Sequence, residues 1–288
     1  MILGNCRGHG LTGIILEAKI KLTKVATSYV RVRSLRTANI KDTLIRLHEF
    51  DKLYEYTVAW LDLSGQKNGR SIVTGACHAN VNELPIKFKS NPVTPLTQNP
   101  IKIPKFQGFS LINSFSTRIF NFFWYHKPLQ NNVQHVQKFL HPLDRVENWN
   151  TLYGTKGFIQ YQFVIPFESS EFLEVVINEL KRARLFSPMA VLKSLGEESK
   201  GLLGFSKEGW TLAVDFALGN PRLNSTLNTL DELLIEVGGR IYLTKDSRMN
   251  SCHMSQMYPK LEQWKSIKSE NDPNNVWQSD QGRRLNLC

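Results

Sequence analysis

The residues from 157 to 247 alternate between two hydrophobic periodicities, in an order that few folds accommodate. Four segments have the pattern of strands: GFIQYQFVIP (157–166), PMAVLKSLG (188–196), GWTLAVDFAL (209–218) and RIYLTKDS (240–247). Residues 169–184 and 222–239 instead place apolar residues three and four apart, as helices do, and the second segment ends in two glycines. The order β-α-β-β-α-β is that of a split βαβ, ferredoxin-like unit, so we predict an α+β fold.

The residues before this unit carry similar but weaker patterns. Residues 14–35 resemble two adjacent strands, 39–53 a helix, 54–63 a strand and 70–79 its partner. The stretch NPVTPLTQNPIKIPK that begins at residue 91 is rich in proline and predicts a loop or flap. We therefore predict a mobile basic and aromatic segment over residues 91–138.

Positive charge is concentrated in the first half of the chain. The net charge is +11, and residues 1–140 hold 19 lysines and arginines against 7 aspartates and glutamates. No acidic residue occurs between Glu83 and Asp144, a window that includes KFQGFSLINSFSTRIFNFFWYHK. Such a field attracts anionic partners, namely nucleic acid, anionic lipid or a phosphorylated substrate. The alternative that remains open is a solvated basic face over the edge of a phenylalanine-rich core.

Several functional classes have no support in the sequence. No apolar run has the length of a membrane span, and the N-terminus lacks the apolar core of a signal peptide. Four scattered cysteines and seven histidines form no metal-binding spacing, so we expect reduced thiols, no metal and a cytoplasmic protein. The central strands lack the aromatic pair on which RNA-binding modules of this order stack bases, which makes nucleic acid an unexpected partner.

Because successive side chains of a strand point to opposite faces of the sheet, the sequence also predicts which polar side chains share a face. Gln160 and Gln162 share one face of their strand, with apolar residues opposite. Lys193 lies between apolar neighbours, and Tyr242 and Lys245 occupy opposite faces of the last strand. Two interpretations remain open: a polar wall that binds a substrate, or the solvent-facing side of an amphipathic sheet.

Six segments occur in an order and spacing that resemble a known family: GLTGIILEAKI, VAWLD, HPLDRVENWNTLYGTKGFIQYQFVIP, GWTLAVDF, GGRIYLTKDSR and DPNNVWQSDQGRRL. The chain resembles the C-terminal half of FAD-dependent oxidases of the decaprenylphosphoryl-ribose 2′-epimerase type. These oxidases belong to the vanillyl-alcohol-oxidase superfamily, alongside the aldonolactone oxidases. The resemblance is weakest across residues 64–138. It implies an oxidoreductase that acts on CH–OH groups with FAD as cofactor.

The resemblance implies a division of the chain into three parts. Residues 1–35 correspond to the end of an FAD-binding domain, and residues 36–245 to a substrate-binding cap domain that includes the segment 91–138. Residues 246–288 return to the FAD domain. We therefore expect the N-terminal flavin-binding half to be missing, with the opening RGHGLTG turn as the last strand and turn of that domain.

The resemblance also assigns roles to individual residues. Lys245 matches a lysine at the flavin pyrimidine edge, where a fixed cation stabilises negative charge as the flavin accepts a hydride. Tyr242, Ile14 and Ile15 match further contacts to the cofactor. The wall that orients the sugar by hydrogen bonds is matched by Gln162, Gln160, Lys193, His141 and Trp60.

Three positions depart from the family pattern. Leu140 replaces a tyrosine, and Thr211 and Ala213 replace an asparagine and a reactive cysteine of mycobacterial members. The changed pocket implies either a related but not identical sugar, such as a polyprenyl-phosphoryl pentose or an aldonolactone-like sugar, or relaxed selection on a decaying gene. It also implies no covalent capture by inhibitors that attack that cysteine. The expected partners are a reductase or epimerase and an anionic inner-membrane surface. The alternative is a truncated, flavin-free remnant or a ferredoxin-like module that binds an anionic partner.

Overall fold

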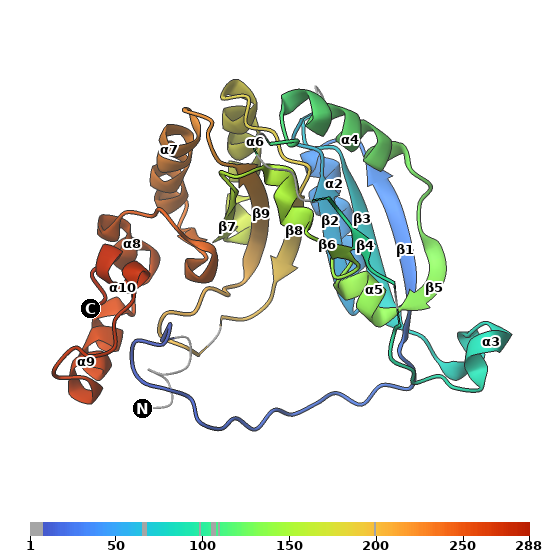
Figure 1. Ribbon diagram of the computed structural model, residues 1–288, viewed down its shortest axis with the longest axis horizontal. Coiled ribbons are helices and arrows are strands. Elements are labelled where there is room, and N and C mark those ends of the chain that lie inside the picture. The colour runs from blue at the N-terminus through green and yellow to red at the C-terminus, as the bar shows by residue number, and fades with distance from the viewer. Residues whose placement is uncertain (1–7, 65–67, 98, 105–107, 109, 199) are drawn as a thin grey trace.

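The computed structural model describes residues 8–64, 68–97, 99–104, 108, 110–198 and 200–288. The strands are β1 (Tyr29–Thr37), β2 (Tyr56–Leu61), β3 (Ser71–His78), β4 (Ile101–Lys102), β5 (Asn131–His135), β6 (Val146–Glu147), β7 (Phe158–Ile165), β8 (Ala190–Leu195), β9 (Gly209–Ala217) and β10 (Arg240–Ile241). Eight of them form one antiparallel sheet in the order β10-β7-β9-β8-β2-β3-β1-β5 (Figure 1). β4 and β6 form a separate parallel pair. The predicted α+β class is confirmed.

The two halves of the sheet share one chain order. β7, α6 (Phe172–Arg182), β8, β9, α7 (Leu223–Glu236) and β10 follow one another, and their strands lie as β10-β7-β9-β8. β1, α2 (Ile40–Asp51), β2, β3, α4 (Ser114–His126) and β5 repeat this succession, with strands in the order β5-β1-β3-β2. The halves meet where β2 pairs with β8. The predicted β-α-β-β-α-β succession is thus present, and its strand order occurs twice.

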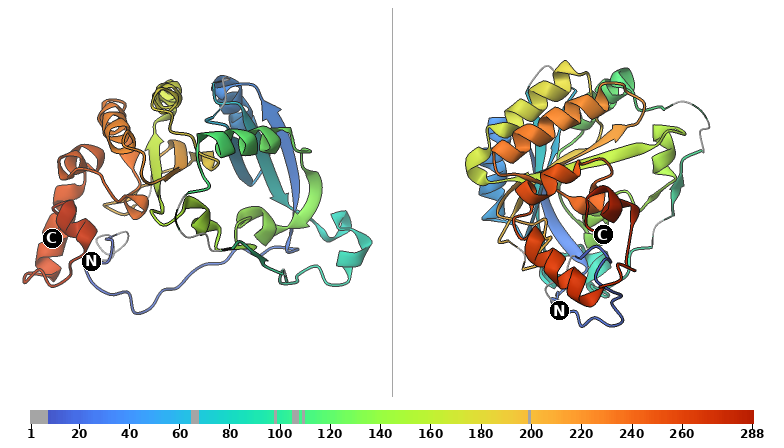
Figure 2. Two further views of the ribbon diagram at one scale, coloured as in Figure 1. Left: turned by 45° about the horizontal axis from the view of Figure 1, so that its top comes forward. Right: turned by 90° about the vertical axis from the view of Figure 1, so that its left-hand side faces the viewer.

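Helices α2, α6 and α7 cover one face of the sheet and bury the main core against it (Figures 1 and 2). α7 contributes four buried leucines at helical spacing: Leu223, Leu227, Leu230 and Leu234. Burial of each such side chain stabilises the fold by about 1.5–3 kcal/mol. The helix ends at Glu236, and Gly238 follows with a φ of 69°. The N–H groups of Gly238 and Gly239 donate to the carbonyls of Ile235 and Leu234. The predicted glycine stop is confirmed.

The opening residues differ from the prediction. Residues 13–25 form no strand and run as an extended chain along the lower edge of the view in Figure 1. Ile14, Leu16 and Leu22 are largely exposed there. An alternating pattern specifies a strand only where a sheet edge is available to pair with it, and β1 begins only at Tyr29. The expected domain boundary at residue 35 falls inside β1.

The segment 91–138 contains regular secondary structure that the sequence did not predict. It contains β4, α4, β5 and the start of α5 (Val136–Leu140), although residues 98, 105–107 and 109 lie outside the described part. Asn113 caps α4 by accepting the N–H groups of Phe115 and Ser116. β5 extends the sheet by pairing with β1. The loop was predicted for residues 91–105, and beyond them, within the segment expected to be mobile, a capped helix and an added strand satisfy the backbone from residue 114 onward.

The C-terminal residues pack beside the β10 edge as α8 (Met254–Met257), α9 (Leu261–Asn271) and α10 (Asp280–Arg284) (Figure 2). Tyr258 and Trp264 are fully buried among them. Leu11, from the opening glycine turn, lies against α10, since a methyl group placed on Gly282 would be 3.2 Å from Leu11 Cδ1. One further short helix, α3, comprises Ile86–Lys89. Among the described residues, no helix is long and apolar enough to span a bilayer.

Candidate functional site

The face of the sheet opposite α2, α6 and α7 carries rows of side chains that cross the strands. Residues paired directly across antiparallel strands point to the same face. The central row consists of Gln162, Ala213, Val191 and Trp60, and the flanking rows of Gln160 with Asp215 and of Val164, Thr211 and Lys193. The structure thus brings Gln160, Gln162, Lys193 and Trp60 to one face, which we call the polar wall.

Hydrogen bonds fix the side chains of the polar wall. The Gln162 amide donates to Thr211 Oγ1 at 3.2 Å, and the Thr211 hydroxyl donates to the Phe163 carbonyl at 2.9 Å. Trp60 Nε1 donates to the Pro188 carbonyl at 3.0 Å. Thr211 is therefore part of the wall's hydrogen-bond network, at a position where the family pattern has asparagine.

Asp215 is a member of this wall that the sequence predictions missed. Its side chain is buried, and Gln160 Nε2 donates to its Oδ1 at 2.6 Å. Burial raises the pKa of the Asp215 carboxyl, while the Gln160 hydrogen bond and the positive charge of Lys245 lower it. Burial, and then the Asp215 charge, also raise the pKa of Tyr153. Asp215 lies on the same face of β9 as Thr211 and Ala213. A charged residue at such a position was the signal that could have identified it.

Lys245 and Tyr242 follow β10 at the edge of the wall. The strand predicted through residue 247 stops at Ile241, and Leu243–Lys245 form a 3₁₀ turn. The Tyr242 N–H donates to the Gln162 carbonyl at 2.8 Å, which continues the central row. Lys245 is exposed, and its charge acts on Asp215. This turn therefore places a cation beside the wall.

A cavity of about 270 Å³ lies next to Tyr242. It is lined by His9, Leu203, Phe205, Ser206, Tyr242, Leu243, Thr244 and Tyr258. The Tyr242 ring stacks on Phe205 with 4.4 Å between centroids, and burial lowers the pKa of His9. Ile14 and Ile15, which follow the same glycine turn as His9, are 67% and 71% exposed. The structure thus brings the opening turn and Tyr242 to one cavity.

His141 does not join the wall in any described contact. It follows α5 and lines a separate cavity of about 140 Å³ with Gln137, Lys138, Asp144, Arg145, Leu96 and Pro100. Leu140, the neighbouring departure from the family pattern, is 45% exposed. Cys77, Cys252 and Cys288 are free thiols, and Cys6 lies outside the described residues.

Sequence comparison confirms the resemblance. No protein-family model matches the chain. The chain is 34% identical over 286 residues to the decaprenylphosphoryl-β-D-ribose oxidase of Mycolicibacterium smegmatis, a match that covers 97% of this chain and 62% of that protein. It is 26% identical over 289 residues to an uncharacterized protein in the mprA 5′ region of Streptomyces coelicolor, covering 97% and 79% of the two chains. The chain therefore spans less than two thirds of the oxidase it resembles.

Solved structures with the same fold are also oxidases. A chitooligosaccharide oxidase superposes with a TM-score of 0.51 and 11% identity, over 89% of this chain and 55% of that chain. The xylooligosaccharide oxidase of Myceliophthora thermophila superposes with a TM-score of 0.50 and 12% identity, over 89% and 55%. At these identities the likeness establishes the fold of this chain and not its activity.

Proposed function

We infer that this chain is the substrate-binding part of an FAD-dependent oxidoreductase that oxidises a hydroxyl-bearing carbon of a sugar. One observation carries the proposal: 97% of the chain matches an oxidase named for decaprenylphosphoryl-β-D-ribose. Within it, we assign the unit from β7 to β10 to a ferredoxin-like substrate domain. The proposed substrate is a polyprenyl-phosphoryl pentose, or an aldonolactone-like sugar, and a reductase or epimerase would take the oxidised product.

The polar wall supports a sugar substrate. The Gln160 and Gln162 amides and the exposed Lys193 ammonium offer hydrogen-bond donors and acceptors in neighbouring rows. Such hydrogen bonds orient a substrate more than they activate it. Ala213, between Gln162 and Val191, replaces a longer side chain by a methyl group, and this leaves room in the central row.

An apolar path supports a substrate with a lipid chain. At the end of the central row, Trp60 lies 6.4 Å from Trp124 between ring centroids, and Trp124 stacks on Phe120 at 5.4 Å. Aromatic side chains therefore continue from the polar wall onto α4. A sugar bound on the wall would direct an apolar substituent along these rings.

The residues near Tyr242 fit one edge of a flavin. The cavity there offers the Tyr242–Phe205 stack together with the polar side chains of His9, Ser206 and Thr244. FAD, when bound, supplies the acceptor for the hydride. Lys245 would stabilise negative charge at that edge. Its positive charge also acts on the Asp215 carboxyl.

The proposal is tested by isothermal titration of the purified chain with a short-chain polyprenyl-phosphoryl ribose, and separately with FAD. We expect Gln162→Ala and Lys193→Ala to weaken binding of the sugar roughly tenfold each, because each removes about one hydrogen bond to the ligand. Gln263→Ala, at an exposed glutamine of α9, is the matched control. Equal affinity for an unrelated oligosaccharide, or unchanged affinity in both wall variants, would refute the proposed substrate site.

A further inference from the structure

Helix α4 packs on the protein through its polar face and turns its apolar face outward. Its only buried residues are Thr117 and Asn121. Six large apolar side chains are exposed instead: Phe115 75%, Ile119 43%, Phe120 43%, Phe122 53%, Phe123 68% and Trp124 38%. The helix at the same place in the chain order of the other half, α7, buries four leucines. A core helix buries its apolar face, whereas α4 leaves its aromatic face exposed.

Hydrogen bonds at Asn121 fix this orientation. The Asn121 amide donates to Asp62 Oδ1 at 2.9 Å, to Ser64 Oγ at 3.1 Å and to the Ser187 carbonyl at 3.2 Å. All three acceptors belong to buried residues outside α4. Burial raises the pKa of the Asp62 carboxyl, but its hydrogen bonds more than offset this effect and leave the pKa lowered. Rotation of α4 to bury its aromatics would break all of these bonds.

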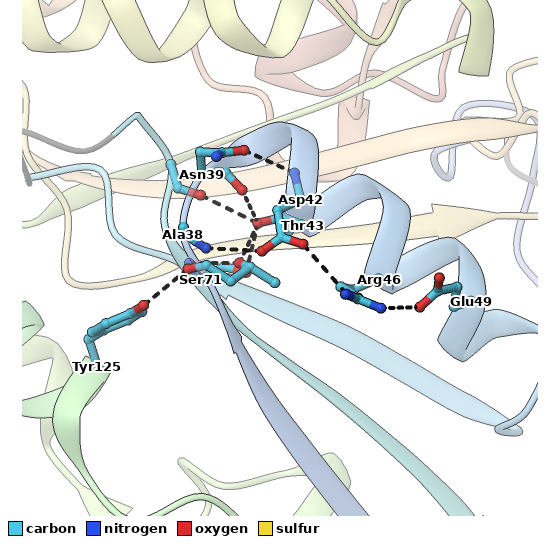
Figure 3. Close-up of polar contacts among 10 residues, drawn as sticks. Ala38, Asn39, Asp42, Thr43, Arg46, Glu49, Ser71 and Tyr125 are labelled. Carbon is cyan, nitrogen blue, oxygen red and sulfur yellow. Dashed lines mark hydrogen bonds and ion pairs between the residues drawn. The ribbon is translucent and has the colours of Figure 1, made fainter.

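A second anchor lies one turn further along α4. The Tyr125 hydroxyl donates to the Thr37 carbonyl at 3.1 Å. Figure 3 shows Tyr125 reaching from α4 toward Ser71, at the start of β3, and Thr43, in the first turn of α2. The Arg70 guanidinium lies 4.3 Å from the Tyr125 ring centroid. Arg36 donates to the carbonyls of Tyr125 and Lys127. The residues at 117, 121 and 125 thus form one anchored stripe.

The outward side of α4 follows from this anchored stripe. Helical periodicity places Phe115, Ile119, Phe122 and Phe123 away from it, and we call these four residues the aromatic ridge. Contiguous apolar surface of this kind is rare on soluble proteins and marks a site of contact with a protein or a membrane.

A basic cavity of about 380 Å³ adjoins the ridge. Its lining includes Arg70, Arg118 and Lys181, with Asp62, Ser64, Phe122 and Phe186. Asp62 is already bound by Arg70 at 2.8 Å, and Lys181 donates to Asn68. Arg118 lies over the Phe186 ring at 5.0 Å. Three cations against one paired carboxylate make this hollow suitable for an anionic oxygen group.

We propose that α4 docks the protein on an anionic bilayer surface. The aromatic ridge enters the boundary between headgroups and acyl chains, and the basic cavity receives the phosphate of a lipid headgroup. An interfacial helix combines an apolar face with basic residues beside it, and α4 has both. The sequence that contains α4 has no acidic residue between Glu83 and Asp144, and therefore none there that would be repelled by such a surface. This proposal concerns a surface distinct from the polar wall, and it stands without the proposed activity.

Docking in this orientation has one consequence that rests on the proposed function. Trp124 and Phe120 lie between the ridge and Trp60. A polyprenyl chain could then pass from the bilayer along these rings while its sugar occupies the wall.

Flotation of the full chain with phosphatidylcholine vesicles, with and without phosphatidylglycerol, tests the proposal. We expect binding only to the anionic vesicles, reduced by salt. Phe115→Ser/Phe123→Ser should abolish it, and Arg118→Gln should weaken it about fivefold, the equivalent of about 1 kcal/mol for one basic residue near an anionic surface. Ile86→Ser/Val276→Ser, at sites 88% and 71% exposed, is the matched control and should bind as the parent does.

Three results would overturn the proposal. The first is no vesicle binding at low salt. The second is stabilisation by inorganic phosphate alone, without vesicle binding. The third is a dimer that the ridge variant dissolves while vesicles have no effect, which would identify a second copy as the occupant. Titration of the ridge variant with polyprenyl-phosphoryl ribose keeps the two proposals separable, because the polar wall is unchanged in it.

Discussion

Gln160 on β7 donates a 2.6 Å hydrogen bond to the buried carboxylate of Asp215 on β9, directly across the strand pair. A neutral amide cannot neutralise a buried charge, so the positive charge of Lys245 is the balancing group among those that act on Asp215. Even so, burial is the largest effect and leaves the pKa of Asp215 raised. A buried carboxylate kept at a cost in stability is typical of a functional site.

Asp215→Asn should therefore be more stable than the parent protein at neutral pH. The folded-state pKa of Asp215 lies above the unfolded value of about 3.9, so the folded state loses stability as pH rises through the interval between the two. At pH values above that interval the folded state carries the full free-energy cost of the buried, ionised Asp215. Below about pH 4 Asp215 is protonated and this cost disappears. Thermal midpoints of both proteins at pH 7 and near pH 4 test this. A gain in midpoint that is the same at both pH values would contradict it.

In a protein that joins this chain to an FAD-binding half, Lys245→Ala should slow the reduction of the flavin by the sugar substrate roughly 10²–10³-fold, the usual cost of removing one preorganised charge stabiliser. Lys245→Arg should recover part of the rate, because it keeps the charge at the end of the 3₁₀ turn. Anaerobic bleaching of the flavin absorbance measures both rates. Lys52→Ala, an exposed lysine after α2, is the control. Equal rates in Lys245→Ala and the parent would make Lys245 a surface residue without a role.

Asn121→Ala should destabilise the protein by about 1–3 kcal/mol, because the buried groups of Asp62, Ser64 and Ser187 each lose a donor. Urea denaturation measures the loss. Asn224→Ala, at an exposed site of α7, is the matched control and should be neutral or slightly stabilising, since alanine favours a helix more than asparagine. A loss of the same size in both variants would mean that the Asn121 anchor contributes little.

The sequence predicts the second half of the fold well and the first half less well. From β7 to α7, strand alternation and helical spacing agree with what is buried: Tyr161 and Phe163 face the core, and Leu227 and Leu234 lie on the buried side of α7. In α4 the relation is reversed. Its apolar residues face outward, so no buried stripe marks the helix, and the proline-rich stretch before it favours a loop.

The sequence likewise predicted some residues of the candidate site and missed others. Parity places Gln160 and Gln162 on one face, and the strand register joins them to Lys193 and Trp60. Asp215 was missed because its importance depends on burial, which the sequence of a single strand does not report. His141 was assigned through the resemblance, and its position in space depends on the path of α5.

Ala213 occupies the position of the reactive cysteine in the family pattern. Ala213 is partly exposed on the polar wall, opposite Gln162, whereas the next residue, Val214, is fully buried on the core face. Ala213→Cys should therefore react with a small alkylating reagent in the folded protein, and Val214→Cys should react only after unfolding. Peptide mapping by mass spectrometry separates the new thiol from the native cysteines, of which Cys252 is exposed and serves as the internal reference.

Alkylation of Ala213→Cys should also fall when polyprenyl-phosphoryl ribose is bound, because a sugar held by Gln162 covers the neighbouring position. Equal reactivity of the two introduced thiols would mean that the wall is not the open face of the sheet, and reactivity of Ala213→Cys that the ligand leaves unchanged would place the sugar elsewhere.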